Sequence, residues 1–358
     1  MSGARPSANR MFVQRRKKLK AFVITAPHEY AYQEFPDPVI NDDEVLIKSR
    51  ASGICHSDYE LISGQYIIPF TYPVIPGHEW SGEVVEVGKN VTRFQPGDRV
   101  VGECVIGCGA CPICQSGNFT NCPTSDHFGF TINGAHAEYL KARPEWLHKL
   151  PDAVSYKQGA LIEPFSVAYH AITANGGTDA SEVVAVLGGG PIGQAAVAAA
   201  SGMGARVVLI EPLAHRQEIG KKLGATEVID PRSADPVELV KSITGGFGAD
   251  LVIESAGVDA SLASALDLPR NNGRISFVGI NIGRVIPVEL GKIQIRGLQI
   301  KGMVGSPYVW ERAIAFLANS GKDISPIVTN EFALDQVEDA FALASKRSEC
   351  IKVMVFNE

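Results

Sequence analysis

The stretch VVAVLGGGPIGQAAVAAASG, residues 183–202, passes from a β-branched run to an alanine-rich run across six residues, four of them glycine. A short apolar run is typical of a buried strand, and an alanine-rich run is typical of a helix. The glycines at 188, 190 and 193 fit the pattern G-x-G-x-x-G between the two. The stretch therefore predicts a strand, a tight turn and a helix, which is the repeating unit of doubly wound α/β folds.

The loop between strand and helix has the features of a pyrophosphate-binding turn. Gly188 permits the tight turn, Gly190 lets the backbone approach a pyrophosphate, and Gly193 lets helix and strand pack closely. Pro191 lacks only an N–H that a first helical turn can spare. The predicted cofactor-binding residues here are Gly188, Gly190, Pro191, Ile192 and Gly193. A domain of this fold that binds no nucleotide is the alternative.

The next predicted strand, RVVLIEP, ends at Glu211, eighteen residues after Gly193. A carboxylate at this position accepts hydrogen bonds from the adenosine ribose and repels a 2′-phosphate, so the sequence favours NAD over NADP. Arg216 keeps NADP open, because an arginine close to this strand end can hold the phosphate.

Strands and helices alternate from residue 181 to about 306, which indicates a parallel sheet covered on both faces. Residues 21 to about 149 instead contain short β-rich runs separated by Pro, Gly and Asp, typical of an all-β or barrel domain. The tail adds two helices and a last strand, CIKVMVF, that can rejoin the first domain. We expect an α/β protein with a catalytic domain over 21–166 and 307–358, a nucleotide-binding domain over 167–306, and a disordered basic extension over 1–20.

The composition excludes several classes of protein. The chain has 358 residues, 45% of them hydrophobic and 20% charged, with a formal net charge of −6. This balance disfavours nucleic acid as the main partner and leaves a small molecule as the default. No apolar run approaches the roughly 20 residues that span a bilayer, so we expect a cytoplasmic protein with no membrane partner.

Four cysteines lie within GCGACPICQSGNFTNC, residues 107–122, with the spacing C-x2-C-x2-C-x7-C. Four thiolates on turn-rich backbone close a tetrahedron around zinc and leave no position for substrate, so this lobe, 104–123, is predicted to hold a structural zinc. An iron–sulfur cluster is the rival, but no companion cluster motif accompanies the spacing. The predicted ligands are Cys108, Cys111, Cys114 and Cys122. A zinc-ribbon nucleic-acid module would rest on this lobe alone.

A second metal site is predicted from distant residues. Cys55 and His56 end one β-rich run, His78 and Glu79 begin another, and Glu163 lies in the apolar run GALIEPFSV, where a carboxylate is costly unless paired or metal-bound. One thiolate, one imidazole and one or two carboxylates hold zinc with a position left open, which is a catalytic arrangement.

Together these motifs resemble the zinc-containing medium-chain dehydrogenase/reductase family, in its polyol, sorbitol and threonine dehydrogenase branch. The residues that carry the resemblance are GHEWSGEVVEVG with Cys55 upstream, the four-cysteine lobe, GALIEPFSV, and GGGPIG with Glu211. FTYPVIPGHEWSG and GFTINGAHAEY are also similar to cyclitol-oxidising members such as the 2-deoxy-scyllo-inosamine dehydrogenases. The resemblance implies a GroES-like β-barrel catalytic domain, a Rossmann domain, two zinc ions per chain, NAD, and a homodimer or homotetramer.

The resemblance also implies roles for individual residues. Cys55 and His78 would bind the catalytic zinc, with Glu79 and Glu163 sharing or exchanging the carboxylate position. Ser57 would take the alcohol proton, and His56 would lie near the cofactor pyrophosphate. The implied reaction is the reversible oxidation of a secondary alcohol of a polyol, sugar or cyclitol to a ketone.

Two departures from the family pattern bear on the substrate and the proton path. Glu60 stands where many relatives have a histidine that passes the proton to solvent. Gly305 and Ser306 stand where sorbitol dehydrogenases have an Arg-Tyr pair that grips the polyol, which lowers sorbitol and favours a cyclic or more compact secondary alcohol. Alternatives are an L-threonine-like dehydrogenase, a zinc-free reductase of the same superfamily, and a non-catalytic nucleotide-binding sensor or structural protein.

Overall fold

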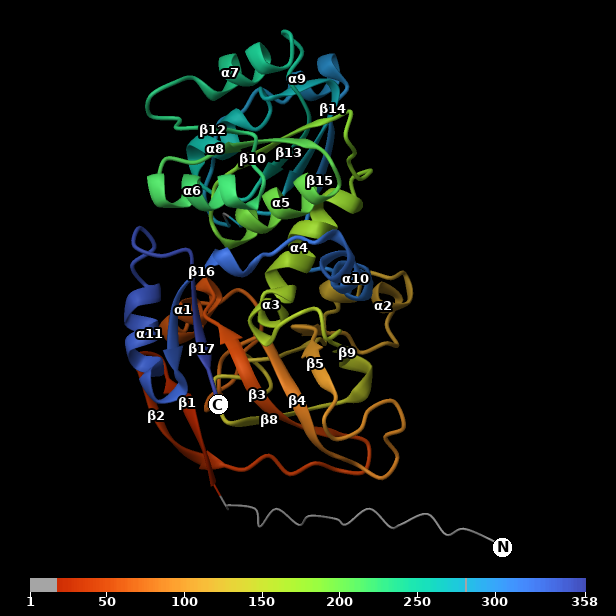
Figure 1. The fold of residues 1–358 in the computed structure, drawn as a ribbon, viewed down its shortest axis with the longest axis vertical. Coiled ribbons are helices and arrows are strands. Elements are labelled where there is room, and N and C mark those ends of the chain that lie inside the picture. Colours follow the sequence, from red (N-terminus) through yellow and green to blue (C-terminus); the bar gives the residue numbers. More distant parts are fainter. Residues whose placement is uncertain (1–17, 281) are drawn as a thin grey trace, which may run out of the picture.

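The computed structural model describes residues 18–280 and 282–358, which form the two lobes shown in Figure 1. The lower lobe in that view contains both described ends of the chain, and the upper lobe is a single insertion between helices α4 (Ile162–Thr173) and α10 (Trp310–Ser320). The predicted extension over residues 1–20 falls almost wholly outside the described residues. Its last three residues are already in a strand, which begins at Lys18.

The lower lobe is built on a seven-stranded sheet with the order β16-β17-β3-β4-β5-β9, where β8 also pairs with β3. All pairs are antiparallel except β16 with β17. The strands are β3 (Val45–Gly53), β4 (Glu79–Val87), β5 (Arg99–Gly102), β8 (Tyr139–Ala142), β9 (Leu147–Lys149), β16 (Val328–Ala333) and β17 (Lys352–Phe356). Two smaller antiparallel pairs complete the lobe: β1 (Lys18–Ala26) with β2 (Glu29–Pro36), and β6 (Val105–Ile106) with β7 (Asp126–His127).

The upper lobe has a six-stranded parallel sheet with the order β12-β11-β10-β13-β14-β15. Counted along the chain this is 3-2-1-4-5-6, the Rossmann order, and the strand order reverses next to β10, where such folds bind nucleotides. The strands are β10 (Val183–Leu187), β11 (Arg206–Ile210), β12 (Glu227–Ile229), β13 (Ala249–Glu254), β14 (Pro269–Phe277) and β15 (Gln299–Gly302). The fold is thus the predicted combination of a GroES-like barrel and a Rossmann sheet.

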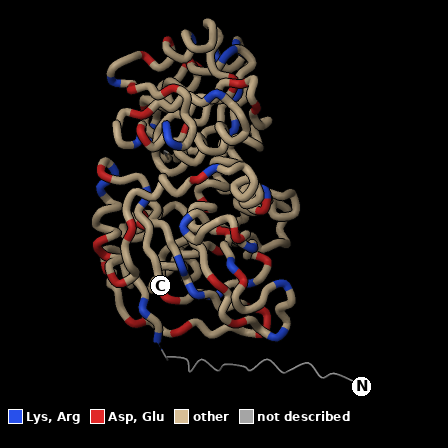
Figure 2. Tube along the Cα trace, in the orientation of Figure 1, with Lys and Arg blue, Asp and Glu red and all other residues tan. Residues whose placement is uncertain are grey.

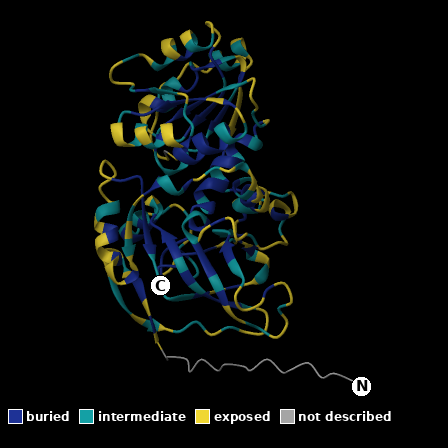
Figure 3. Cartoon of the chain, viewed as in Figure 1, coloured by how far each residue is buried: buried dark blue, intermediate teal, exposed yellow. Residues whose placement is uncertain are grey.

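The parallel sheet is buried on both faces, which explains its near-continuous apolar strands. Val184 and Val186 of β10 pack into one hydrophobic cluster, while Ala185 and Leu187 pack into another on the opposite face. Figure 3 shows these strands as buried and the outer faces of the surrounding helices as exposed.

In Figure 1, α5 to α9 lie in the upper lobe, α1, α2, α3 and α11 lie in the lower lobe, and α4 and α10 lie where the two lobes meet. The remaining α-helices are α1 (His56–Ser63), α2 (Pro112–Gln115), α3 (Tyr156–Ala160), α5 (Pro191–Gly202), α6 (Ala214–Leu223), α7 (Pro236–Ile243), α8 (Asp259–Ser264), α9 (Gly291–Arg296) and α11 (Val337–Ala344). Single 3-10 turns are η1 (Phe119–Asn121), η2 (Pro144–Trp146), η3 (Ser325–Ile327) and η4 (Leu334–Gln336). In the described part of the chain, no helix has the length and apolar character to cross a bilayer.

One predicted strand, RVVGECV, is divided in the structure. β5 ends at Gly102, where Glu103 N–H donates to Trp146 O, and the chain then leaves the large sheet to form β6. β6 pairs with β7 instead, because Val105 lies opposite His127 in a separate two-stranded sheet. As a result Glu103 and Cys104, which lie between β5 and β6, line the same small cavity as Glu163.

Candidate metal centres and cofactor site

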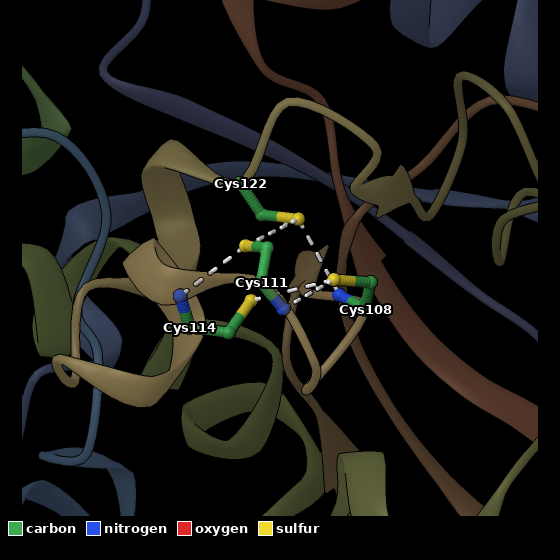
Figure 4. Close-up of side chains that lie close together, drawn as sticks. All are labelled: Cys108, Cys111, Cys114 and Cys122. Carbon is green, nitrogen blue, oxygen red and sulfur yellow. Dashed lines mark hydrogen bonds between the residues drawn. The ribbon is translucent and has the colours of Figure 1, made fainter.

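The four cysteines of the lobe converge, and Figure 4 shows their sulfur atoms facing a common point. One sulfur from each lies within 4.8 Å of the others. Cys108 and Cys114 have their sulfurs 3.9 Å apart, and those of Cys111 and Cys122 are 3.8 Å apart. A tetrahedron with zinc–sulfur bonds of about 2.3 Å has edges of about 3.8 Å, so the four sulfurs fit one zinc ion.

The backbone of this lobe stabilises thiolates, the form that binds metal. Cys111 N–H donates to Cys108 Sγ, Cys114 N–H donates to Cys111 Sγ, and Cys108 N–H approaches Cys122 Sγ at 3.5 Å. Backbone hydrogen bonds from Ala110 and Cys111 lower the pKa of Cys108 to about 6. The donor set therefore suits a metal ion better than a disulfide, and all four thiols are free.

The second group forms where β3 and β4 run side by side. Gly53, the last residue of β3, lies opposite Glu79, the first residue of β4. Cys55 follows β3 as the N-cap of α1, and His78 precedes β4. Ligand atoms of Cys55, His78 and Glu79 lie within 4.8 Å of one another. The antiparallel register therefore brings together residues that are 23 and 24 positions apart in sequence.

Buried polar atoms without hydrogen-bond partners mark this group as incomplete. They include His78 Nδ1, Glu79 Oε2 and Asp58 Oδ1. His78 Nδ1 faces Asp58 Oδ1 at 3.7 Å, which leaves the other ring nitrogen for a metal ion. A carboxylate behind a ligating histidine is the usual arrangement in metal sites, so these residues fit a zinc ion.

Asp58 and Lys352 are the two supporting residues that the sequence interpretation missed. Asp58 is fully buried and accepts a hydrogen bond of 2.8 Å from Cys55 N–H. Burial would raise its pKa, but the proximity of His78 and the hydrogen bond from Cys55 N–H lower it below the ordinary value, so Asp58 is an anion. Lys352 Nζ donates to Glu79 Oε1 at 2.7 Å and to Ile54 O at 2.9 Å.

Both residues had a signal in the sequence. Asp58 stands three positions after Cys55, the spacing of a capping box, and the structure has that box at the start of α1. Lys352 is a lone cation within the apolar strand CIKVMVF, where a charge requires a partner.

The two carboxylates predicted as alternative ligands of the catalytic zinc occupy different positions. Glu79 belongs to the compact group with Cys55 and His78, whereas Glu163, in the first turn of α4, is not part of that group. Glu163 lines a small cavity of about 10 Å³ with Glu103, Cys104 and Ser306. Burial, with a further contribution from nearby Glu79, raises the pKa of Glu163 to about 7.

Ser57, the residue expected to take the alcohol proton, and His56, expected to lie near the cofactor pyrophosphate, both lie on α1. Ser57 is in its first turn, half-buried, two residues after Cys55. His56 is exposed, and its Nε2 lies 3.9 Å from Glu60 Oε1 one turn later. The guanidinium of Arg347 contacts both ring nitrogens of His56. Burial and Arg347 together lower the pKa of His56.

The glycine loop lies between β10 and α5 at the reversal point of the parallel sheet. Gly188 has a φ of +94°, and a Cβ at Gly193 would lie 1.8 Å from Gly188 O, so neither position accepts a side chain. At Gly190, the N-cap of α5, a Cβ would meet nothing within 4 Å. The backbone is thus open to a ligand at the positive end of α5, whose first turn contains Pro191 and Ile192.

Glu211 follows β11 and is buried beside this loop. Its carboxylate accepts hydrogen bonds from Gly189 N–H at 2.6 Å and Leu213 N–H at 2.8 Å. Arg216, in the first turn of α6, is directed elsewhere: its guanidinium donates to the carbonyl oxygens of Arg347 and Cys350 in the lower lobe. Gln194 was not anticipated, and its side chain donates to Gly189 O and Arg216 O.

Known proteins are similar to this chain over almost its whole length. One family model, described as the alcohol dehydrogenase GroES-like domain, matches residues 41–152, and another, described as zinc-binding dehydrogenase, matches 191–319. The sorbitol dehydrogenase of Bacillus subtilis is 38% identical over 349 residues, which cover 95% of this chain and 98% of the relative. The L-threonine 3-dehydrogenase of Shewanella loihica is 34% identical over 331 residues, covering 90% of this chain and 95% of the relative. A Sinorhizobium meliloti 1021 protein crystallised with NADP has a TM-score of 0.89 at 30% identity, covering 95% of this chain and 100% of that one.

Proposed function

The chain belongs to the zinc-containing medium-chain dehydrogenase/reductase family, in the branch of the polyol and threonine dehydrogenases, and we propose that it reversibly oxidises a secondary alcohol to a ketone with NAD. Its general activity is that of an oxidoreductase acting on alcohols. The observation that supports the proposal most directly is the group of Cys55, His78 and Glu79, with its unpartnered buried atoms.

We propose two zinc ions per chain, one structural and one catalytic. The catalytic zinc would be held by Cys55, His78 and a carboxylate, and it would supply Lewis acidity that lowers the pKa of the substrate hydroxyl. Around that site Asp58 orients the imidazole of His78, and Lys352 balances the charge of Glu79. Glu163, with its raised pKa, is the second carboxylate available to the same centre.

We propose that Ser57 takes the proton of the alcohol. Its place in the first turn of α1, directly after the ligand segment, puts the hydroxyl on the same rigid element as Cys55. His56 and Glu60, 3.9 Å apart on the exposed side of α1, would then pass the proton to solvent in place of the histidine found in many relatives.

NAD is the proposed cofactor, supplying the hydride acceptor. The carboxylate of Glu211 lies beside Gly189, where it would repel a 2′-phosphate. The guanidinium of Arg216 donates hydrogen bonds to two carbonyl oxygens of the lower lobe, so it is not free to bind that phosphate. The Sinorhizobium meliloti protein was crystallised with NADP, so NADP is the comparison ligand in any binding experiment.

The proposed substrate is a cyclic or compact polyol, sugar or cyclitol. Gly305 and Ser306 stand where an Arg-Tyr pair would be expected in a sorbitol dehydrogenase, and Ser306 Oγ lies 2.7 Å from Ser166 Oγ within the protein. The cavity beside them is lined by two carboxylates, Glu103 and Glu163, and by no lysine or arginine. At about 10 Å³ this cavity has room for about one water molecule, which the two carboxylates could bind.

We also propose a homodimer or homotetramer located in the cytoplasm. β15 lies at the edge of the upper sheet, and in the described residues it pairs only with β14. All four of its residues are exposed, and so are Val285, Leu290 and Ile295, which precede it in the sequence. Such an edge favours pairing with a second copy. Basic and acidic residues are interspersed over both lobes (Figure 2), an arrangement that supports a small-molecule substrate rather than nucleic acid.

The proposal is tested by a panel of polyols, sugars, inositols, amino-cyclitols and L-threonine assayed with NAD and NADP and ranked by kcat/KM. Metal analysis of the same protein should give about two zinc ions per chain. Cys55→Ser should lose one zinc and nearly all turnover, whereas Cys350→Ser, which changes a buried thiol outside both groups, should keep both. Wild-type turnover in Cys55→Ser would overturn the proposed mechanism, and a panel without any oxidised alcohol would point to a sensor.

A further inference from the structure

Tyr66 lies between the two segments that carry candidate ligands of the catalytic metal. Cys55 is the N-cap of α1, and His78 precedes β4. α1 ends at Ser63, and the left-handed backbone of Gly64, with a φ of +72°, turns the chain away from the helix. Tyr66 follows two residues later, in the connection that leads to β4.

Ring contacts place Tyr66 one side chain away from His78. The Tyr66 ring stacks on Phe130, with the two centroids 4.8 Å apart and 27° between the ring planes. Phe130 also contacts the imidazole of His78, at a centroid distance of 5.2 Å. Because Phe130 is buried and well packed, it forms a fixed apolar support for both neighbouring rings.

The Tyr66 hydroxyl has no hydrogen-bond partner among the residues that the structure describes. The two nearest tyrosines in the sequence differ in this respect. Tyr59 OH donates to Phe341 O at 2.6 Å. Tyr72 OH donates to Leu61 O. A half-buried phenol usually finds a partner, so the free hydroxyl of Tyr66 is available to a ligand.

The charges around Tyr66 suit a neutral ligand group. Burial raises the pKa of Tyr66 to about 13, so the phenol keeps its proton and remains a donor. The titratable groups whose charges affect this pKa most are His78, Cys104, Cys55 and Glu60, and none of these is a lysine or an arginine. A carboxylate or phosphate bound here would find no such cation among them, whereas a hydroxyl requires none.

We propose that the Tyr66 hydroxyl binds a second hydroxyl of the substrate, beside the one that is oxidised. The inference rests on the proposed function and narrows its substrate class to neutral diols and polyols. A phenol both donates and accepts a hydrogen bond, which matches an alcohol group. A mono-alcohol would leave the phenol unpaired in the occupied site, so the site discriminates against it.

The test compares matched alcohols on the zinc-loaded full chain with NAD: cyclohexanol with trans-1,2-cyclohexanediol, and 2-butanol with 2,3-butanediol. The wild type should oxidise each diol with a kcat/KM about tenfold or more above that of its mono-alcohol. Tyr66→Phe should lose about tenfold on the diols, mainly through KM, and leave the mono-alcohols unchanged. Tyr72→Phe is the matched control, because it removes a nearby hydroxyl that is already bonded to Leu61 O, and it should keep the wild-type ratio.

Calorimetric binding of trans-1,2-cyclohexanediol gives a readout independent of turnover. NADH replaces NAD, so that the diol cannot be oxidised, and Tyr66→Phe should bind it about tenfold more weakly than the wild type. If Tyr66→Phe keeps the wild-type ratio of diol to mono-alcohol, the hydroxyl contact is wrong and the proposed alcohol oxidation is untouched. If no alcohol is oxidised while Tyr66→Phe still binds the diol more weakly, the proposed reaction is wrong and the contact holds. A wild type that neither oxidises nor binds the diols overturns both.

Discussion

Lys352 Nζ lies 2.7 Å from Glu79 Oε1, and both side chains are almost completely buried, at 3% and 2% exposure. β17 thus supplies the positive charge that balances the carboxylate of Glu79, a candidate ligand of the catalytic metal. Burial opposes the ammonium form, but the proximity of Glu79 raises the pKa of Lys352 above its usual value. Lys352 therefore remains charged throughout the neutral range.

Replacing Lys352 with methionine should leave a buried, unbalanced carboxylate at Glu79. Loss of one partner from a buried ion pair costs about 3–5 kcal/mol, so urea unfolding of metal-free Lys352→Met should show a loss of that order. The double variant Lys352→Met with Glu79→Gln should recover most of it, because no isolated charge remains. A single variant within about 1 kcal/mol of the wild type would contradict a stabilising pair.

Replacing Cys111 with serine should remove the structural zinc and leave the catalytic group in place. Three thiolates bind zinc less tightly than four, and the turn-rich lobe is expected to depend on its metal ion for its ordered structure. Metal analysis should fall from about two zinc ions to about one, and amide exchange over residues 108–122 should accelerate at least about a hundredfold. Unchanged exchange would show that the lobe does not depend on its metal, and Cys350→Ser serves as the control thiol.

Replacing Glu211 with serine should shift cofactor preference from NAD towards NADP. The carboxylate that would accept from the ribose and repel a 2′-phosphate is removed, so NAD should bind about tenfold more weakly and NADP more tightly. The gain for NADP should be small, since the Arg216 guanidinium remains bonded to the other lobe. Glu227→Ser, at the start of the next strand, is the matched control. An unchanged ratio of the two affinities would place the ribose elsewhere.

Replacing His136 with glutamine should flatten the dependence of stability on pH. His136 is fully buried with Nδ1 2.8 Å from Ser52 Oγ, and burial lowers its pKa from 6.5 to about 4. The unfolded chain therefore binds a proton between these values that the folded protein does not, so stability is intact above pH 6.5 and is lost as pH falls towards 4.

From pH 7 to 5 the wild type should lose about 2 kcal/mol more unfolding free energy than His136→Gln, whose side chain does not titrate. Urea unfolding of both proteins at the two pH values measures the difference, in which changes common to both cancel. Parallel losses would mean that His136 is protonated in the fold or is solvated.

Local patterns were sufficient to predict the Rossmann sheet and the cysteine lobe. Apolar strands such as VVAVL and the glycine turn after them depend on neighbours within a few residues, and the ligands of the lobe span fifteen positions. The alternation of buried faces along β10 follows directly from the strand period of two.

The support of the catalytic group required long-range contacts that no short pattern contains. Lys352 meets Glu79 only because β17 pairs with β3 and β3 with β4, across 273 positions of sequence. Likewise the separation of Glu79 from Glu163 depends on where α4 enters the lobe, and the contact of Arg347 with His56 depends on the packing of α11. Motifs identified candidate ligands, but the tertiary pairing determined their partners.

The position of β17 has a consequence for biosynthesis. This strand fills the gap between β16 and β3, yet it follows all the other strands of the described residues along the chain. The upper lobe, continuous in sequence, can fold while the chain is still being made, whereas the lower sheet cannot close before residues 352–356 have emerged. A nascent chain that ends before Lys352 therefore lacks the cation that neutralises Glu79, and the group of Cys55, His78 and Glu79 gains this partner only after residue 352 has been made.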